Sequence, residues 1–382
     1  MKVLSSVAGL ILLLTILWDA FETIILPRRV TRRVRLTRYF YRFTWIPWSA
    51  VARRIRAGNR REAFLSFYGP LSLLLLFAVW AIGLILSFAL LHWAAGSVIN
   101  APNGAATFAT DLYMSGTTFF TLGLGDVIPR TRLARIITVI EAGTGFGVLA
   151  IVIAYLPVLY GAFSKREVNI SLLDARAGSP PTAAELLRRH GEEQNVESLT
   201  QFLRDWEVWA AELMESHLSY PALCYFRSQH NNQSWLAALT TILDACALII
   251  SCGEGTLRWQ AQLTFAISRH AVVDLSQILN VPPRTPASDR LSRDRLAQLR
   301  SILQLAGVPV CGASATDLKL GQLRPLYEPY VSGLADRLIM PLPEWVLAVG
   351  SKDNWRTSAW EHTSIQPAGS GVSKGAEGDE HF

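Results

Sequence analysis

The chain contains 382 residues with a formal net charge of +6, 51% hydrophobic residues and 17% charged residues. This charge content lies below the ~25% usual for soluble proteins, and the apolar residues gather in three stretches near or beyond the roughly 20 residues that span a bilayer. These features exclude a wholly soluble protein. With 4 Cys, 26 Gly and 18 Pro, the composition also excludes a disulfide-dense scaffold and a collagen-like chain.

The first apolar run, residues 1–26, predicts an N-terminal transmembrane helix. A secretory signal is the alternative, but no small-residue cleavage site follows, and the run continues into a dense arginine tract as a stop-transfer helix does. Asp19 and Glu22 share one face near the end of this helix, where intramembrane carboxylates are costly. We expect them to pair with Arg28, Arg29 or another basic residue.

Residues 27–62 form a basic segment with twelve arginines, whereas residues 63–129 contain neither Lys nor Arg. Because basic residues in short loops mark the cytoplasmic side, we expect a multi-pass protein of the cell membrane with its N-terminus outside and its C-terminal domain in the cytoplasm. Aromatic residues alternate with the arginines, which favours an interfacial helix against anionic lipid along residues 28–61. Nucleic-acid contact is the disfavoured alternative.

A pore-like arrangement is predicted for residues 63–164. Two apolar helices, an outer one at 67–95 and an inner one at 131–163, flank a run at 108–120 that is too short to span a bilayer and a Gly-alternating stretch at 121–126, named here the filter segment. This order indicates a re-entrant pore loop, because non-helical backbone at membrane depth is tolerated only where it lines water or is buried in protein.

The filter segment has the composition that a dehydrated cation requires. Such a cation needs rings of carbonyl oxygens in place of its water shell. Gly123 and Gly125 alternate along the segment, and glycine lets successive carbonyls turn toward one axis because it accepts positive φ without steric cost. Thr121 can add its carbonyl and hydroxyl at the inner end, and Asp126 closes the outer end with a carboxylate.

The stretch from Thr118 to Asp126, TFFTLGLGD, resembles the T-x-x-T-x-G-Y-G-D signature of the potassium-channel pore family. The resemblance covers roughly residues 67–163 and implies a two-transmembrane-type pore module, here with an extra N-terminal span, that assembles as a homotetramer. It implies no cofactor, and potassium ions are the permeant species. By this resemblance, the ion is held by backbone oxygens of Thr121, Leu122, Gly123 and Leu124, the filter continues through Gly125 and Asp126, and Thr117 and Thr118 support it from the pore helix.

Two residues depart from the family pattern. Leu124 stands where the family has a filter aromatic, so the hydroxyl that would brace the filter is missing, and Met114 stands where a pore-helix tryptophan is often found. We therefore expect a cation pore that prefers potassium less strictly than family members with the aromatic. A non-selective cation channel is the alternative.

Three glycines, Gly143, Gly145 and Gly147, lie in the upper half of the predicted inner helix. A hinge and close helix packing are both open for Gly143 and Gly147, whereas Gly145 resembles the family's hinge glycine and is interpreted as one. Pro157 removes a backbone hydrogen bond nearer the cytoplasmic end and predicts a kink there, a natural place for a gate.

Glu141 is an acidic residue inside the inner helix, one turn before Gly145. Intramembrane carboxylates usually face the protein interior or water. Two interpretations stay open: ion attraction or filter stabilisation, and a protonated carboxyl that is hydrogen-bonded to a pore-helix hydroxyl such as that of Thr117 or Ser115.

Residues 165–349 are predicted to form a helical cytoplasmic domain that opens with a linker at 178–181. Apolar residues recur at helical spacing from Val196 to Leu213, after an N-cap at Asn195. Further helices are predicted at 233–251, 256–279, 291–305 and 322–339. Residues 350–382 are polar and Gly/Ser-rich, and they are predicted to be disordered.

The run at 235–251 is apolar enough to suggest a fourth span, but Asp244 interrupts it and it is short for a crossing, so we expect a core helix. The cysteines, Cys224, Cys246, Cys252 and Cys311, match no zinc spacing, and we expect reduced thiols with Cys246 buried.

The predicted fold class is thus an all-α membrane protein with a potassium-channel-like pore and a helical cytoplasmic domain. The predicted function is passive conduction of cations, potassium first among them, without enzymatic activity. A non-conducting membrane receptor or scaffold that works through its cytoplasmic domain, and a membrane-anchored enzyme, are the alternatives from other classes.

Overall fold

The computed structural model describes residues 2–26, 35–96, 99–100, 107–192, 195–230, 233–286, 288–308 and 313–347. These residues are helical apart from loops and one pair of two-residue strands, so the predicted all-α fold class is confirmed. The chain divides into two compact units. The first contains residues 1–56 and 63–162, and the second contains residues 57–62 and the chain from 163 onward.

The described part of the first unit contains three long apolar helices, a basic and aromatic helix and a short helix. Its strands β1 and β2 pair antiparallel so that Ile99 lies opposite Pro129. Its elements are α1 (Lys2–Ala20), the π-helical turn η1 (Phe21–Ile25), α2 (Leu36–Arg54), α4 (Tyr68–Ala95), β1 (Ile99–Asn100), α5 (Phe108–Phe119), β2 (Ile128–Pro129) and the first part of α6 (Arg132–Ala177). The short helix α3 (Asn59–Ser66) precedes α4.

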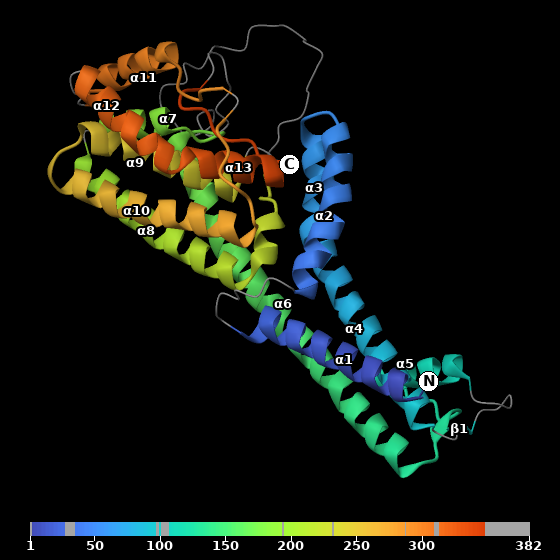
Figure 1. Ribbon diagram of the computed structural model, residues 1–382. Helices are drawn as coiled ribbons and strands as arrows, with labels where there is room; N and C mark the ends of the chain where they lie inside the picture. The colour runs from blue at the N-terminus through green and yellow to red at the C-terminus, as the bar shows by residue number, and fades with distance from the viewer. Residues whose placement is uncertain are drawn as a thin grey trace, which may run out of the picture. The chain divides into compact units, whose positions relative to one another are not determined.

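Helix α1 packs along α4 (Figure 1). Small residues allow this approach: a Cβ added at Gly9 would lie 2.9 Å from the carbonyl oxygen of Ser87, and one added at Gly83 would lie 2.4 Å from the Ile16 side chain. Ile16 is buried with Trp80 in an apolar cluster between the two helices. The predicted N-terminal span is therefore packed into the first unit as an integral helix.

Asp19 links α1 to both α2 and α4. Its carboxylate accepts hydrogen bonds from the backbone N–H of Thr37 (3.2 Å), the Thr37 hydroxyl (2.5 Å) and Trp80 Nε1 (3.1 Å). Neutral donors from two neighbouring helices thus bind this carboxylate, while Arg28 and Arg29, the basic partners predicted for it, lie outside the described residues.

Glu22 follows the prediction more closely. It accepts a hydrogen bond from Trp18 Nε1 (2.7 Å), and its carboxylate lies 3.5 Å from Arg35 Nε, a basic residue beyond the two named as candidates. Arg28 and Arg29 lie outside the described residues.

In its described part, the predicted basic segment 27–62 forms α2 and the start of α3. Helix α2 packs against the start of α4: the rings of Trp45 and Tyr68 meet edge to face at 4.7 Å, and the hydroxyls of Thr44 and Tyr68 lie 2.9 Å apart. The remaining surface of α2 is basic and aromatic, with exposed Arg38, Tyr39, Arg42, Phe43, Ile46, Arg53 and Arg54.

The second unit is a bundle of helices in which α8 and α10 pack side by side (Figure 1). Its elements after α6 are α7 (Ala183–Glu192), α8 (Val196–Ser219), the 3-10 turn η2 (Pro221–Tyr225), α9 (Trp235–Cys252), α10 (Gly255–Ile278), α11 (Arg293–Leu305), α12 (Ala313–Leu323), the 3-10 turn η3 (Arg324–Leu326) and α13 (Glu328–Leu338).

Two helix ends in this unit test the sequence analysis directly. The Asn195 side chain accepts from the Ser198 N–H (2.8 Å), which confirms the predicted N-cap of α8. The prediction of a single helix at 322–339 is wrong, because the chain forms α12, η3 and α13 in this region. Pro325 lies at this break, where it lacks the N–H that a continuing helix needs.

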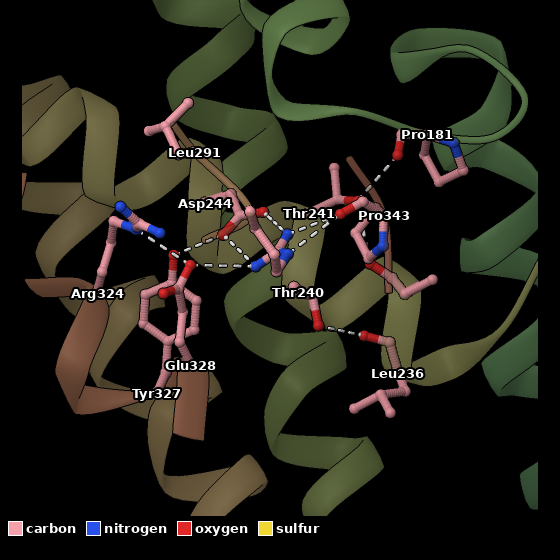
Figure 2. Close-up of polar contacts among 12 residues, drawn as sticks. Pro181, Leu236, Thr240, Thr241, Asp244, Leu291, Arg324, Tyr327, Glu328 and Pro343 are labelled. Atoms are coloured by element: carbon pink, nitrogen blue, oxygen red, sulfur yellow. Dashed lines mark hydrogen bonds and ion pairs between the residues drawn. The ribbon is translucent and has the colours of Figure 1, made fainter. Parts of the chain in front are cut away.

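Helix α9 is one of four stretches in the described chain that are long and apolar enough to cross a membrane, together with residues 2–25, 59–95 and 132–177. However, 89% of its apolar window is buried within the protein. Its interrupting Asp244 binds Arg290 Nη2 and the Tyr327 hydroxyl, each at 2.5 Å. Figure 2 shows Asp244 and Tyr327 within a group of polar contacts. The burial and this pairing support the predicted core helix.

Helix α6 is longer than predicted. It runs without a break past residue 163 to Ala177 and stops before Gly178, whose φ is +84°. The extension is stable because its polar groups are satisfied in the second unit. Buried Arg166 donates to the carbonyl oxygens of Leu223 (3.1 Å) and Phe226 (3.0 Å).

The cysteines agree with their expected structural role. Cys224, Cys246 and Cys252 are free thiols, the first two are fully buried, and burial raises the pKa of Cys224 to about 12. Cys311 and the tail at 350–382 lie outside the described residues. Within the described ranges, no group of three or more His, Cys, Asp or Glu is placed to hold a metal ion.

Candidate functional site

Helix α5 occupies the position predicted for the pore helix. Its 12 residues reach only about 18 Å, too little to cross a bilayer. At its start, the Thr107 backbone N–H donates to the Thr110 hydroxyl (3.2 Å). Its C-terminus leads directly into the filter segment, so the negative end of the helix dipole lies next to the place where a cation would sit.

The end of α5 and the start of the filter segment form one hydrogen-bonded motif. The N–H of Leu122 donates to the carbonyl of Thr117 (2.8 Å), and the N–H of Thr121 donates to the carbonyl of Thr118 (3.0 Å). These two bonds are the pair that defines a Schellman C-cap. Thr117 and Thr118 therefore hold the inner end of the filter segment through their backbone oxygens.

Left-handed backbone recurs at every second residue of the filter segment, with φ of +57° at Thr121, +55° at Gly123 and +76° at Gly125. The two glycines adopt this conformation freely, whereas Thr121 is β-branched and is strained there. Alternation between residues of positive and negative φ allows successive carbonyls to face one side. The positive φ at Gly123 and Gly125 thus agrees with the conformation expected from the glycine alternation.

The outer end of the filter segment is tied back to the same helix. Tyr113 of α5 donates its hydroxyl to Asp126 Oδ2 (2.9 Å). The sequence analysis missed Tyr113, although a hydroxyl-bearing aromatic in the pore helix ahead of an acidic residue was the signal available. Leu124 carries no hydroxyl, so Tyr113 supplies the described bracing at this end.

Behind α5, three helices meet at a fully buried polar cluster. Nε2 of His92 from α4 lies 3.2 Å from Oε2 of Glu141 in α6, and Ser115 of α5 is hydrogen-bonded to the other carboxyl oxygen of Glu141. The Ser115 hydroxyl also lies 2.8 Å from the carbonyl oxygen of Ile85. Of the two hydroxyls suggested by sequence, Ser115 reaches Glu141, while the Thr117 hydroxyl donates to Met114 O (3.0 Å).

His92 is the second residue that the sequence analysis missed. The sequence indicated it in one way: residues 63–129 contain no Lys or Arg, and their only His, Asp or Glu residues are His92, Asp111 and Asp126. A buried Glu141 in the neighbouring helix needs a polar partner. His92, in the last turn of α4, was a candidate for this partner.

Gly145 lies where α6 approaches the end of α5 most closely. A Cβ added to Gly145 would lie 2.0 Å from the carbonyl oxygen of Phe119, whereas one added to Gly143 or Gly147 would meet nothing within 4 Å. Close approach therefore requires glycine at 145. Pro157 lies inside the continuous helix α6.

With this geometry established, comparison with known proteins identifies the segment. Residues 72–159, which contain α5 and the filter segment, match a family model described as ion channel. The match confirms that this part of the chain resembles the pore modules of ion channels.

One curated relative is similar over much of the chain. The uncharacterized membrane protein YdjJ of Bacillus subtilis (strain 168) is 23% identical over 264 residues, which cover 68% of this chain and 74% of that protein. No solved structure matches the chain significantly.

Proposed function

We propose that this protein conducts potassium passively through a pore that four copies of the chain form around the filter segment. The observation that carries the proposal is the alternation of left-handed backbone at Thr121, Gly123 and Gly125, directly after a helix too short to span the membrane. The match of residues 72–159 to an ion-channel family supports the same conclusion.

The backbone oxygens of Thr121, Leu122, Gly123 and Leu124 replace the water shell of the ion. One chain supplies one strand of carbonyls, so a ring needs several chains, and a closed symmetric oligomer provides them. In a single chain the side chains of Leu122 and Leu124 are 62% and 63% exposed. Neighbouring copies would cover this apolar surface.

The arginines support an orientation for the channel. With residues 27–62 in the cytoplasm, the N-terminus and the filter mouth lie outside and the second unit lies inside the cell. Single cysteines near Asn100 should then react with an impermeant external thiol reagent, and those near Gly58 should not. The reverse labelling pattern would contradict the orientation. The exposed basic and aromatic face of α2 fits anionic lipid at the inner surface.

Ion flux into liposomes that contain only the purified protein tests the function. Potassium should enter along its gradient, reversal potentials should favour potassium over sodium, and native mass measurements in mild detergent should show a tetramer. The variant Gly123→Ala forces a Cβ onto a left-handed residue and should abolish flux. Gly161→Ala, in α6 with nothing within 4 Å of the added Cβ, is the matched control.

A non-selective cation channel is the second candidate, because Leu124 lacks the bracing hydroxyl of the family aromatic. Sodium and potassium permeating equally would establish it. Permeation of anions would refute the filter assignment, and an absence of flux, or a monodisperse monomer, would leave the receptor or scaffold function in its place.

A further inference from the structure

The polar cluster of His92, Ser115 and Glu141 lies on the side of α5 that meets α4 and α6. All three side chains are fully buried, and they come from three different helices, α4, α5 and α6. Burying polar groups of this kind is costly unless they satisfy one another. Conduction by backbone carbonyls does not by itself require such a cluster.

The hydrogen-bond geometry of the cluster favours a neutral Glu141. The Ser115 hydroxyl has one proton, but it lies against two oxygen atoms, the Ile85 carbonyl at 2.8 Å and the Glu141 carboxyl. Both contacts are satisfied when Glu141 is neutral: its carboxyl then donates to Ser115, and Ser115 donates to Ile85. The second carboxyl oxygen accepts from Nε2 of His92 at 3.2 Å.

Helix α6 contacts α5 at two points with the same spacing. Glu141 meets Ser115, and four residues later Gly145 meets the backbone of Phe119, itself four residues after Ser115. Residues four apart lie on one helix face, so one face of α6 fixes one face of α5 over a full turn. This turn is the last one before the Schellman bonds that hold Thr121.

We propose that Glu141 is a positioning residue for ion selectivity, which as a neutral carboxyl fixes the pore helix through Ser115 and so sets the geometry of the filter segment. This inference rests on the proposed conduction and deepens it. Without the hydrogen bond, α5 loses its polar contact with α6 and keeps only the Gly145 contact with that helix one turn later, so α5 can shift relative to α6. The carbonyls of Thr117 and Thr118, which carry the filter segment, move with it.

The experiment compares two substitutions of nearly equal size in the full-length reconstituted protein. In Glu141→Gln, the amide donates to Ser115 and its oxygen accepts from His92, so the cluster is preserved without a carboxyl. In Glu141→Leu, the volume is kept and both bonds are lost. Thr138→Ala is the control on the same helix, because the Thr138 hydroxyl donates to the carbonyl of Ala134 one turn away (2.8 Å).

The readout is the potassium-to-sodium permeability ratio from reversal potentials, measured on fractions with the oligomeric size of the unaltered protein. We expect Glu141→Gln and Thr138→Ala to stay within about twofold of the unaltered ratio, and Glu141→Leu to lower it about tenfold or more. Ser115→Ala, which removes one hydroxyl, should act like Glu141→Leu and serves as the second variant if Glu141→Leu does not assemble.

Each outcome has one meaning. An unchanged ratio in Glu141→Leu or Ser115→Ala overturns the positioning role. A ratio that falls equally in Glu141→Gln also overturns it, because the negative charge would then be the requirement. An unaltered protein that conducts sodium and potassium equally overturns it too, since no selectivity is then positioned. An unaltered protein without flux refutes the proposed function itself, a result distinct from these three.

Discussion

Replacing Gly145 by alanine places a methyl group where α6 and α5 leave no room for it. The added Cβ would lie 2.0 Å from the carbonyl oxygen of Phe119. This oxygen belongs to backbone at the end of α5, two residues before Thr121, so no flexible side chain can move aside to relieve the overlap.

The size of the effect follows from that distance. To reach 3.0 Å, below which Cβ contacts are essentially never found, the Phe119 carbonyl must move by about 1 Å relative to α6. Overpacking of this kind costs typically ~1–3 kcal/mol. If the strain is relieved by displacing the filter segment, the ratio of channels with an intact filter to channels with a displaced one falls about 5- to 150-fold.

Single-channel recording in planar bilayers checks this expectation, because it separates selectivity from the frequency of opening. Gly145→Ala should lower the potassium-to-sodium permeability ratio or abolish conduction. Gly143→Ala and Gly147→Ala are matched controls on the same helix, since all three substitutions raise helix propensity equally and the two controls create no contact within 4 Å. Both controls should keep the unaltered permeability ratio.

The opposite result would refute the argument from packing. If Gly145→Ala conducts with unchanged selectivity and merely opens less often, Gly145 acts as the hinge that its resemblance suggested. If all three alanine variants behave alike, the contact with Phe119 does not determine the geometry of the filter segment.

Three further predictions concern the remaining polar contacts. Arg188 and Arg189 outweigh the effect of burial and lower the pKa of Glu185 from 4.5 to about 2; Glu185→Gln should therefore destabilise the second unit at neutral pH by up to ~3 kcal/mol, about half that after solvent screening. This stabilisation is present above about pH 4.5 and lost toward pH 2, so unfolding followed by tryptophan fluorescence should show the two proteins converging as the pH falls, and a constant difference would contradict the pairing. Arg166→Met leaves the buried Glu167 carboxylate without its ion-pair partner (2.8 Å) and removes the bonds to the carbonyls of Leu223 and Phe226. It should cost ~3–5 kcal/mol, seen as faster hydrogen exchange in η2, whereas the exposed Lys165→Met should not; equal exchange in both would count against the buried contact. Tyr113→Phe removes the hydroxyl bonded to Asp126 (2.9 Å) and should speed the decay of potassium current severalfold, in keeping with a bond of ~1 kcal/mol; an unchanged decay would show that this contact does not brace the filter.

The features that the sequence determined are local ones. The apolar runs predicted the helices at 2–25, 68–95 and 108–119 to within a few residues. A continuous apolar run indicates a helix, and its length indicates whether that helix can span a membrane. The glycine alternation likewise predicted the left-handed positions Gly123 and Gly125, because this backbone conformation depends on the residue type at each position alone.

Partners between helices were decided by the tertiary structure. Packing of α1 against α4 places Asp19 against Trp80, a neutral donor that the sequence did not indicate. The sequence offered Glu141 two hydroxyls one helical half-turn apart, and the rotation of α5 brought Ser115 to it and added His92 from α4. Such choices depend on the relative rotation of helices, which no local pattern encodes.

The end of α6 and the burial of α9 have the same origin. No helix breaker lies between residue 163 and Gly178, and α6 continues because the second unit supplies partners for Arg166. The composition of α9 suits both a lipid and a protein environment, and Arg290, far along the chain from Asp244, makes the difference by pairing with it. A charged residue inside an apolar helix indicates that it needs a polar or oppositely charged partner. Only the folded chain determines which residue lies close enough to be that partner.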